Sequence, residues 1–389
     1  MNDRQRFLAT MHYQPRDRAP ICDFSFWPET IDAWKSQGLP AWVERGYHYQ
    51  TEQKFFGTDT YNGGPAGNVG MSPGLETKVI EDRGDQEVVQ NSDGVLLLQH
   101  KKGHGQSIPM YLDHTLKDRQ SWEQHFKWRY DPTSRDRYPK DWDAARKIWS
   151  DPNCPYPRCV HGGSFYGRIR DMMGVEGVSY LVYDDPACFE DMVVTQTDCK
   201  VGVINRLYEE GAQVDCVSMW EDMCYNGGSL LTPDLFKKYL VPQIKRVTDI
   251  FRGHGCDIIW TDCDGKVDDL IPMWLEAGIN CLFPIEVGTW GADPVKIRQQ
   301  YGKELLMMGG FDKHILAKSK ADIDQEIYRL APVVEEGGFI PFPDHRVPPD
   351  VPLENYMHYL KTARHVWGKD VNLKPLGELE VPAEALDRL

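Results

Sequence analysis

Acidic residues stand directly after almost every short apolar segment of this sequence. A single aspartate in such a place often only caps the next helix, and Asp264 and Asp312 fit that role best. Many carboxylates meeting at one mouth, however, would repel one another unless they bind a cation, share protons or receive a cationic group of a substrate. The set therefore predicts a chemical site, and its members are Asp23, Glu221, Asp222, Asp262, Asp264, Glu286, Asp312 and Asp344.

His345 is the most specific candidate for chemistry. It lies between Asp344 and Arg346 and just before the helix-breaking run VPPDVP, so we expect it in a loop. A structural histidine whose hydrogen bonds are satisfied internally is the alternative. Together with Asp262, Cys263 and Asp264, His345 would complete a zinc site with oxygen, nitrogen and sulfur ligands. The spacing of these residues is not a zinc signature by itself. The predicted metal ligands are Asp262, Cys263, Asp264 and His345.

We expect the remaining candidate residues to act on or around a small substrate. The predicted catalytic residues are Asp264, His345, Glu221 and Tyr166, and the predicted substrate-binding residues are Asp23, Trp27, Glu286, Asp312 and Arg346. The run HGGSFYG (161–167) offers backbone N–H groups near a helix start, although its glycines also suit tight packing. The aromatic run FSFW (24–27) would line an apolar pocket, but aromatic residues are as often part of a core.

Composition and missing motifs exclude several classes of function. The chain has 389 residues with a formal net charge of −15, which disfavours nucleic acid and anionic membranes as partners. No GxGxxG, GxxxxGK[ST] or GxSxG motif is present. Neither a signal peptide nor an apolar run of about 20 residues is found, and the ten cysteines show no framework spacing. These features favour a cytoplasmic protein with reduced thiols.

The elements that must position these residues are clearest in the second half of the chain. Short apolar segments alternate there with amphipathic helical stretches, several of which end in glycine. Nearly continuous apolar strands joined by helices form parallel sheets buried on both faces. In a parallel barrel, residues just after the strands surround the active site. The predicted strands of this half are 214–220, 256–260, 280–287, 304–311 and 339–342.

The first half is less regular. A first strand is expected at residues 19–27, and another ends near Gly163. Residues 57–74 form a long Gly/Pro-rich loop, and residues 76–100 predict antiparallel strands that turn at DRGDQ and NSDG. A closed barrel and a doubly wound sheet both fit the number of strands, and the final strand and helix without a domain break favour the barrel. The resulting fold class is α/β: a (β/α)8 TIM barrel with an inserted antiparallel β-meander in the N-terminal half. We expect one domain over residues 1–389, with the insertion at 57–115 and a C-terminal tail at 370–389.

Several segments carry a resemblance to a known family. They are RQRFLATMHYQPRDRAP, LLTPDLFKKYLVPQIKRV, LIPMWLEAGINCLFPIE, ELLMMGGFDK and GGFIPFPDHRVPPDVPLENY. Mainly over its C-terminal two thirds, the chain resembles the uroporphyrinogen decarboxylase superfamily, which includes corrinoid-dependent methyltransferases. The resemblance implies a TIM barrel.

The resemblance also bears on the metal site. The methyltransferase branch binds zinc through a His-x-Cys pair and a later Cys. The matching positions here are Asp262, Asp264 and His345, so metal-capable but harder ligands replace thiolates. A thiol methyl acceptor is therefore not expected. In the decarboxylase branch a histidine matches His345, but that branch's Arg-rich segment near the first strand is replaced here by CDFSFW.

Two enzymatic hypotheses and one binding hypothesis remain open. The first is transfer of a methyl group between a small methylated substrate, such as a methoxylated aromatic or a methylamine, and a corrinoid (cobalamin) carried by a separate partner protein. The second is a cofactor-free decarboxylase in which Asp or His protonates a carbanion. The third is a carbohydrate- or amine-binding barrel. FDKHILA (311–317) only partly matches a cobalt-binding loop, because Ala317 stands where glycine is usual. A homodimer is one assembly state that the sequence allows.

Overall fold

The computed structural model describes residues 1–44, 50–101 and 109–380. The chain divides into two compact units, and each is described by itself. Unit 1 comprises Met1–Tyr61, Pro155–Pro157 and Cys281–Leu389, and unit 2 comprises Asn62–Cys154 and Arg158–Asn280. One domain over the whole chain therefore stays a prediction. Of the predicted C-terminal tail, residues 381–389 lie outside the described residues.

Three parallel strands form the central sheet of unit 2. They are β5 (Cys159–Gly163), β6 (Cys216–Trp220) and β9 (Ile259–Asp262), with β6 paired to both neighbours. In the register, His161 lies opposite Ser218 and Trp220 lies opposite Asp262. Most residues of these strands are buried, as expected for strands that are covered on both faces. The carboxyl ends of β6 and β9 therefore bring two predicted acidic segments side by side.

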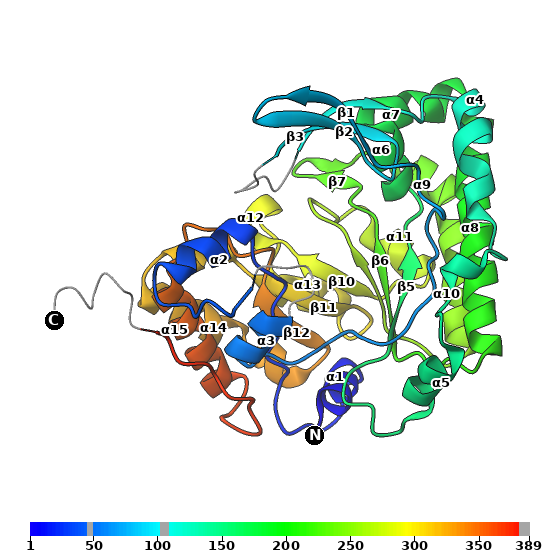
Figure 1. Ribbon diagram of the computed structural model, residues 1–389. Coiled ribbons are helices and arrows are strands. Elements are labelled where there is room, and N and C mark those ends of the chain that lie inside the picture. The colour runs from blue at the N-terminus through cyan, green and yellow to red at the C-terminus, as the bar shows by residue number, and fades with distance from the viewer. Residues whose placement is uncertain (45–49, 102–108, 381–389) are drawn as a thin grey trace. The chain divides into compact units, whose positions relative to one another are not determined.

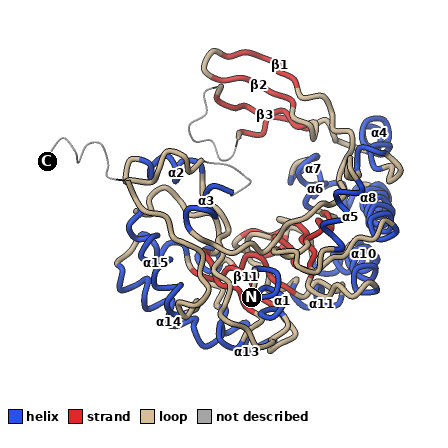
Figure 2. Tube along the Cα trace, turned by 60° about the horizontal axis from the view of Figure 1, so that its bottom comes forward, coloured by secondary structure: helices blue, strands red, loops and turns tan. Residues whose placement is uncertain are grey.

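The antiparallel meander is also part of unit 2 and confirms the predicted insertion. Its strands β1 (Lys78–Arg83), β2 (Gln86–Gln90), β3 (Val95–His100) and β4 (Met110–His114) pair in chain order. The first turn contains Gly84 at a φ of +80° and the second contains Gly94 at +77°, which is why glycine suits both. The sheet lies beside α6 (Gly167–Met173), which contacts β3 (Figures 1 and 2).

Helices cover the parallel strands of unit 2. The predicted helices at 165–182 and 186–210 correspond to α6, α7 (Val175–Asp184) and α8 (Pro186–Glu209). The long α8 packs against α10, as Figure 1 shows. A short hairpin, β7 (Cys224–Tyr225) and β8 (Gly228–Ser229), follows β6. The other helices of this unit are α4 (Arg119–Ser121), η1 (Trp122–Phe126), η2 (Lys127–Tyr130), η3 (Arg135–Arg137), α5 (Trp142–Ser150), α9 (Pro233–Tyr239), α10 (Val241–Gly253) and α11 (Ile271–Glu276).

Unit 1 has its own parallel strands, β10 (Cys281–Ile285), β11 (Leu306–Phe311) and β12 (Phe339–Pro343), with β11 in the middle. The predicted first strand at 19–27 is wrong in extent, because only a single bridge between Phe26 and Val347 forms there. The physical reason is a contact with Asp59, which lies far along the chain. The Ile21 N–H donates to the Asp59 carboxylate at 2.9 Å and the Asp59 N–H donates to the Ile21 carbonyl, while Pro20 has no N–H to donate.

The helices of unit 1 pack on these strands and on one another. Helices α14 and α15 lie side by side, and α14 covers β12 (Figures 1 and 2). Four aromatic side chains, one of them from α2, pack together with ring centroids 4.9–5.8 Å apart. They are Phe26, Trp34, Phe56 and Tyr356. The helices of this unit are α1 (Asp3–Met11), α2 (Pro28–Lys35), α3 (Gln50–Phe56), α12 (Val287–Trp290), α13 (Pro294–Tyr301), η4 (Lys313–Ala317), α14 (Lys320–Glu336) and α15 (Leu353–Val366).

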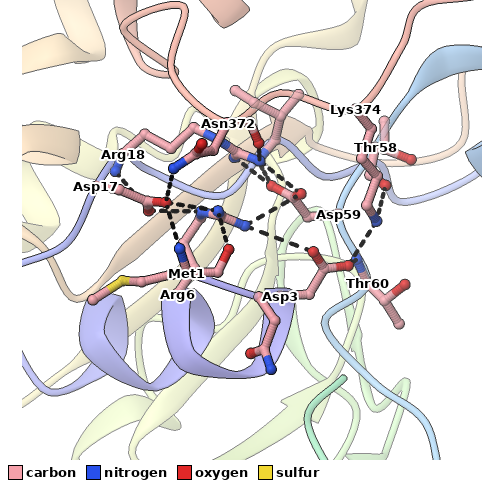
Figure 3. A network of polar contacts seen from close by, with 12 residues as sticks. Met1, Asp3, Arg6, Asp17, Arg18, Thr58, Asp59, Thr60, Asn372 and Lys374 are labelled. Atoms are coloured by element: carbon pink, nitrogen blue, oxygen red, sulfur yellow. Dashed lines mark hydrogen bonds and ion pairs between the residues drawn. The ribbon is translucent and has the colours of Figure 1, made fainter. Parts of the chain in front are cut away.

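A buried ionic network ties the N-terminal segment of unit 1 to residues 58–60 and 372–374 (Figure 3). Asp59 is its centre. The carboxylate accepts two hydrogen bonds from Arg18, one of 2.9 Å, and lies 3.6 Å from Arg6, and all three side chains are at most 2% exposed. These arginines hold the pKa of Asp59 below its ordinary value against the opposing effect of burial. The network fixes the segment that leads into the predicted site residues Asp23 and Trp27.

The architecture confirms the α/β class. In the described ranges, three parallel strands occur in each unit and alternate with helices. Among the described residues, no helix is both long enough and apolar enough to cross a membrane.

Candidate active site

Three aspartates come together at the carboxyl ends of β6 and β9 in unit 2. One carboxylate oxygen each of Asp222, Asp262 and Asp264 lies within 4.8 Å of the others. The adjacent, register-paired strands place them there, since Asp222 follows Trp220 closely and Asp262 ends β9. The Asp264 N–H donates to the Asp222 carboxylate at 3.1 Å, and Asp222 has a φ of +43°. A strained backbone that turns a carboxylate toward two others is typical of functional sites.

The surroundings of Asp222 favour its protonated form. Burial and, next, repulsion by the Asp264 carboxylate raise the pKa of Asp222 to about 6. Arg170 acts in the opposite direction, from 3.7 Å away, and its guanidinium lies over the Trp220 ring. A carboxyl group with such a pKa can hold and deliver a proton near neutral pH, which is the property of a general acid.

Cys263 lies between two members of this cluster in the sequence and contacts the segment that follows β6. Its sulfur accepts a hydrogen bond from the Met223 N–H at 3.4 Å, and the side chain is buried. Burial and the neighbouring Cys224 raise the pKa of Cys263 well above its ordinary value. In the metal-free protein the Cys263 thiol therefore keeps its proton, whereas zinc binds the thiolate and would displace that proton.

Glu221 collects the backbone N–H groups at the start of α6. Its oxygens accept hydrogen bonds from Phe165, Tyr166 and Gly167 at 2.7–3.0 Å, and the side chain is 1% exposed. The HGGSFYG run therefore does present N–H groups, but to a carboxylate of the same unit. The close approach of this loop to Glu221 requires glycine at position 167, since a Cβ on Gly167 would lie 2.1 Å from the Glu221 carbonyl oxygen. This geometry gives Glu221 a role in holding the loop.

Tyr166 is completely buried on this loop, and burial raises the pKa of its phenol to about 12. Next to the loop, His161 projects from β5 and is exposed, with its Nδ1 3.3 Å from the Ser218 hydroxyl. Burial of its surroundings and the charge of Lys200 lower the pKa of His161 to about 4, so its imidazole is neutral at neutral pH. The Lys200 side chain itself is buried and lies over the Phe165 ring.

In unit 1, the Asp344 carboxylate accepts several backbone N–H groups, as the Glu221 carboxylate does in unit 2. This fully buried carboxylate accepts hydrogen bonds from the N–H groups of Val287, Gly288 and Lys313 at 2.8–3.0 Å. It thereby joins the loops that follow β10, β11 and β12. His345 follows directly, so its backbone position is fixed by these bonds.

His345 is held between aromatic rings. Its imidazole stacks on Phe24 with 5.1 Å between centroids, and Trp27 lies at 5.8 Å. Phe24 in turn contacts Phe283 at 5.4 Å, and the Arg346 guanidinium lies over the Trp27 ring at 4.7 Å. The run FSFW thus contributes Phe24 and Trp27 to the surroundings of His345, and the apolar pocket expected there stays a prediction.

The other predicted residues of unit 1 occupy separate settings. The Tyr356 hydroxyl donates to Asp23, and burial raises the pKa of Asp23 to about 7. Glu286 is buried and accepts from the Thr289 hydroxyl at 2.9 Å. Asp312 caps η4 through the His314 N–H, which is the capping role that the sequence left open for it.

The predicted residues therefore fall into two sets. Unit 2 holds Tyr166, Glu221, Asp262, Cys263 and Asp264, and unit 1 holds Asp23, Trp27, Glu286, Asp312, His345 and Arg346. A common pocket for both sets stays a prediction. The sequence placed Asp222 in the acidic set but assigned it no catalytic, binding or metal role, and it did not select Arg170, His161 or Lys200. For Asp222 the signal was its place after an apolar strand, whereas the other three are recognisable only from their surroundings in space.

The three aspartates of unit 2 form a candidate metal centre of oxygen ligands, and the zinc site that the resemblance implied stays a prediction. Three carboxylates are hard oxygen ligands, which suit Mg²⁺ or Mn²⁺, whereas zinc prefers imidazole and thiolate. The ligand set of Asp262, Cys263, Asp264 and His345 stays a prediction.

Comparisons with known proteins match this geometry. The family model described as "Uroporphyrinogen decarboxylase (URO-D)" matches residues 169–366, just over half of the chain. The chain belongs to the uroporphyrinogen decarboxylase family. The family's fold is a TIM barrel, which confirms the predicted fold class and supports an enzymatic function. No curated protein sequence matches the chain.

Solved structures of similar fold include a methyltransferase from Methanosarcina mazei. It shares 15% identity, with a TM-score of 0.55 over 94% of this chain and 98% of that one. A B12-independent methionine synthase from a Shewanella species matches at 10% identity and a TM-score of 0.36, over 55% of this chain and 63% of that one. At this level of identity the first likeness shows a shared fold over nearly the whole of this family member.

Proposed function

We propose that this protein transfers the methyl group of a methoxylated aromatic compound to a corrinoid carried by a separate protein. The observation that carries the proposal lies in unit 1. The segment CDFSFW, which replaces the Arg-rich segment of the decarboxylase branch, lays the Phe24 and Trp27 rings against His345. Aromatic side chains bind an aromatic ring by stacking but give no charge pairing to a porphyrinogen with many carboxylates.

The chemistry needs a proton at the leaving oxygen. When the methyl–oxygen bond of an aryl ether breaks, the corrinoid supplies the electron pair for the new bond to carbon, and the aryl oxygen keeps the old pair. That oxygen leaves more readily as a phenol than as a phenolate. Asp222 is the group suited to donate the proton, since its pKa of about 6 leaves part of it protonated near neutral pH.

The neighbours of Asp222 set its proton affinity. Asp264 raises the pKa of Asp222 by repulsion, and the Asp264 N–H fixes the orientation of the Asp222 carboxyl. Arg170 limits the effect by attracting the carboxylate form. In unit 1, His345 is the polar group beside the Phe24 and Trp27 rings. The decarboxylase alternative would also employ an acid, but nothing in these aromatic rings favours it.

A panel of methyl donors tests this proposal. We expect cobalt(I) cobalamin to be methylated, seen as a change in its visible absorbance, when the protein is supplied with methoxybenzenes. Trimethylamine and dimethylamine should give no change, because near neutral pH they are ammonium ions that already carry a proton on nitrogen. They would leave as neutral amines and gain nothing from a further acid. Reactions without protein are the control. Methylation from the amines alone would contradict the assignment of substrate class.

A further inference from the structure

Unit 2 contains a buried lysine whose ammonium group has no hydrogen-bond or ion-pair partner among the described residues. The Lys200 side chain, on α8, is 1% exposed. Within the described part of the chain its Nζ makes neither a hydrogen bond nor an ion pair. The Nζ lies over the face of the Phe165 ring, 4.8 Å from the ring centroid. Burial of a charge without a partner is unfavourable. It lowers the pKa of Lys200 to about 8, which still leaves most of the group charged at neutral pH.

The surrounding backbone makes room for this lysine. Gly163 has a φ of +91°, and a Cβ at that position would lie 2.4 Å from Lys200 Cε. Any other residue at 163 would therefore displace the lysine stem as well as strain the backbone. The second glycine of HGGSFYG thus has a specific purpose: it lets the Lys200 side chain reach from α8 toward β5.

The two arginines whose charges act on Lys200 are bonded to other groups. Arg168 pairs with Asp93 at 2.6 Å, and Arg137 donates to backbone carbonyls such as that of Asn68 at 2.9 Å. Among the causes that raise the pKa of Lys200, Cys199 comes first and the Glu221 carboxylate second. Its oxygens, however, accept the backbone N–H groups of the α6 loop and do not reach the ammonium.

His161 is exposed and feels the charge of Lys200. It is neutral at neutral pH and lies near enough for the Lys200 charge to lower its pKa. Its register partner Ser218, on β6, adds a hydroxyl 3.3 Å from the imidazole. An anion that enters beside His161 would meet an ammonium, an imidazole and a hydroxyl, all of which can donate hydrogen bonds.

We propose that Lys200, with His161 and Ser218, forms a subsite for one carboxylate group of a ligand. The subsite holds a single anion, unlike the arginine clusters that bind polycarboxylates. The identity of the ligand rests on the proposed function, which makes it a methoxylated aromatic acid. The subsite itself does not depend on methyl transfer.

Direct binding measurements without corrinoid test the subsite, with 4-methoxybenzoate and its neutral analogue 4-methoxybenzamide as probes. Titration calorimetry on the wild-type protein should give a Kd about tenfold to hundredfold lower for the benzoate, as expected for a charged hydrogen bond. In Lys200→Met the preference should vanish. The matched control is Lys237→Met, which removes an exposed lysine that pairs with Glu276 and should keep the preference. Equal binding of both probes by the wild-type protein, or an unchanged preference in Lys200→Met, would overturn the proposal.

A second measurement needs no substitution at Lys200. In histidine-labelled wild-type protein, 4-methoxybenzoate should raise the pKa of His161 seen by NMR, since the anion offsets the lysine charge, and the benzamide should not. No shift at a saturating benzoate concentration would also overturn the subsite. Carboxylate binding through Lys200 without methyl transfer would contradict the proposed function only. Methyl transfer with no preference for carboxylated donors would contradict the subsite only.

Discussion

Asp222→Asn is expected to lower the rate of methyl transfer from methoxybenzenes by about 10²–10⁴-fold, the usual range for loss of a general acid. Asparagine keeps the shape of the side chain but cannot deliver the proton. In the wild-type protein the rate should fall as the pH rises through about 6, because burial and the Asp264 charge raise the pKa of Asp222 to that value. Asp222→Asn should remove this dependence.

Asp264→Asn is the matched variant, because it keeps the acid and removes the charge that repels it. The pH at which the rate falls should move downward, since one cause of the raised pKa of Asp222 is gone. Methyl donors with electron-poor rings, whose phenolates leave readily, should be less sensitive to Asp222→Asn than electron-rich ones. A rate in Asp222→Asn within tenfold of wild type, with the pH dependence intact, would exclude Asp222 as the acid.

Asp59→Asn is expected to lower the free energy of unfolding by about 3–5 kcal/mol, because it leaves buried arginine charge without its partner. Asp59 is 2% exposed and bonds Arg18, which is equally buried (Figure 3). Urea denaturation followed by circular dichroism measures the change. Glu354→Gln removes an exposed carboxylate that pairs with Lys320, and it should leave the unfolding midpoint unchanged. A similar midpoint in both variants would mean that the network of Figure 3 does not stabilise unit 1.

The same network predicts the direction of acid sensitivity. The folded-state pKa of Asp59 lies below its ordinary value. Its stabilising contribution is therefore present above the unfolded value of about 3.9 and is lost as the pH falls through the folded value. The stability of the wild-type protein should thus decrease at acidic pH more steeply than that of Asp59→Asn.

Much of the fold followed from patterns in the sequence. Apolar runs between helices marked the strands from Cys159 onward, and NSDG marked a turn of the meander. The strand predicted at 19–27 failed because pairing there is decided by a distant side chain: Asp59 takes the Ile21 N–H. Such a contact spans 38 residues and leaves no periodic signal.

The candidate site was harder to predict, because acidic residues that look alike in sequence differ in their contacts. Glu221 and Asp222 are adjacent, yet the first accepts backbone N–H groups and the second turns toward Asp264. Their position at the end of a strand marks both residues as candidates for the site, but it does not show which of them binds backbone N–H groups and which turns toward Asp264. Lys200 gave no signal, since a lysine within a long helix is normally exposed. Its burial depends on Gly163, which belongs to another element.

The most direct test of methyl transfer is the fate of two labels in one substrate. 4-Methoxybenzoate would carry one isotope in its methyl group and another in its carboxyl group, and would be incubated with the protein and cobalt(I) cobalamin. The proposed function predicts that the methyl label moves to cobalt while the carboxyl label stays with 4-hydroxybenzoate. Release of the carboxyl label as carbon dioxide, with the methyl label left on the ring oxygen, would contradict it and establish the decarboxylase alternative.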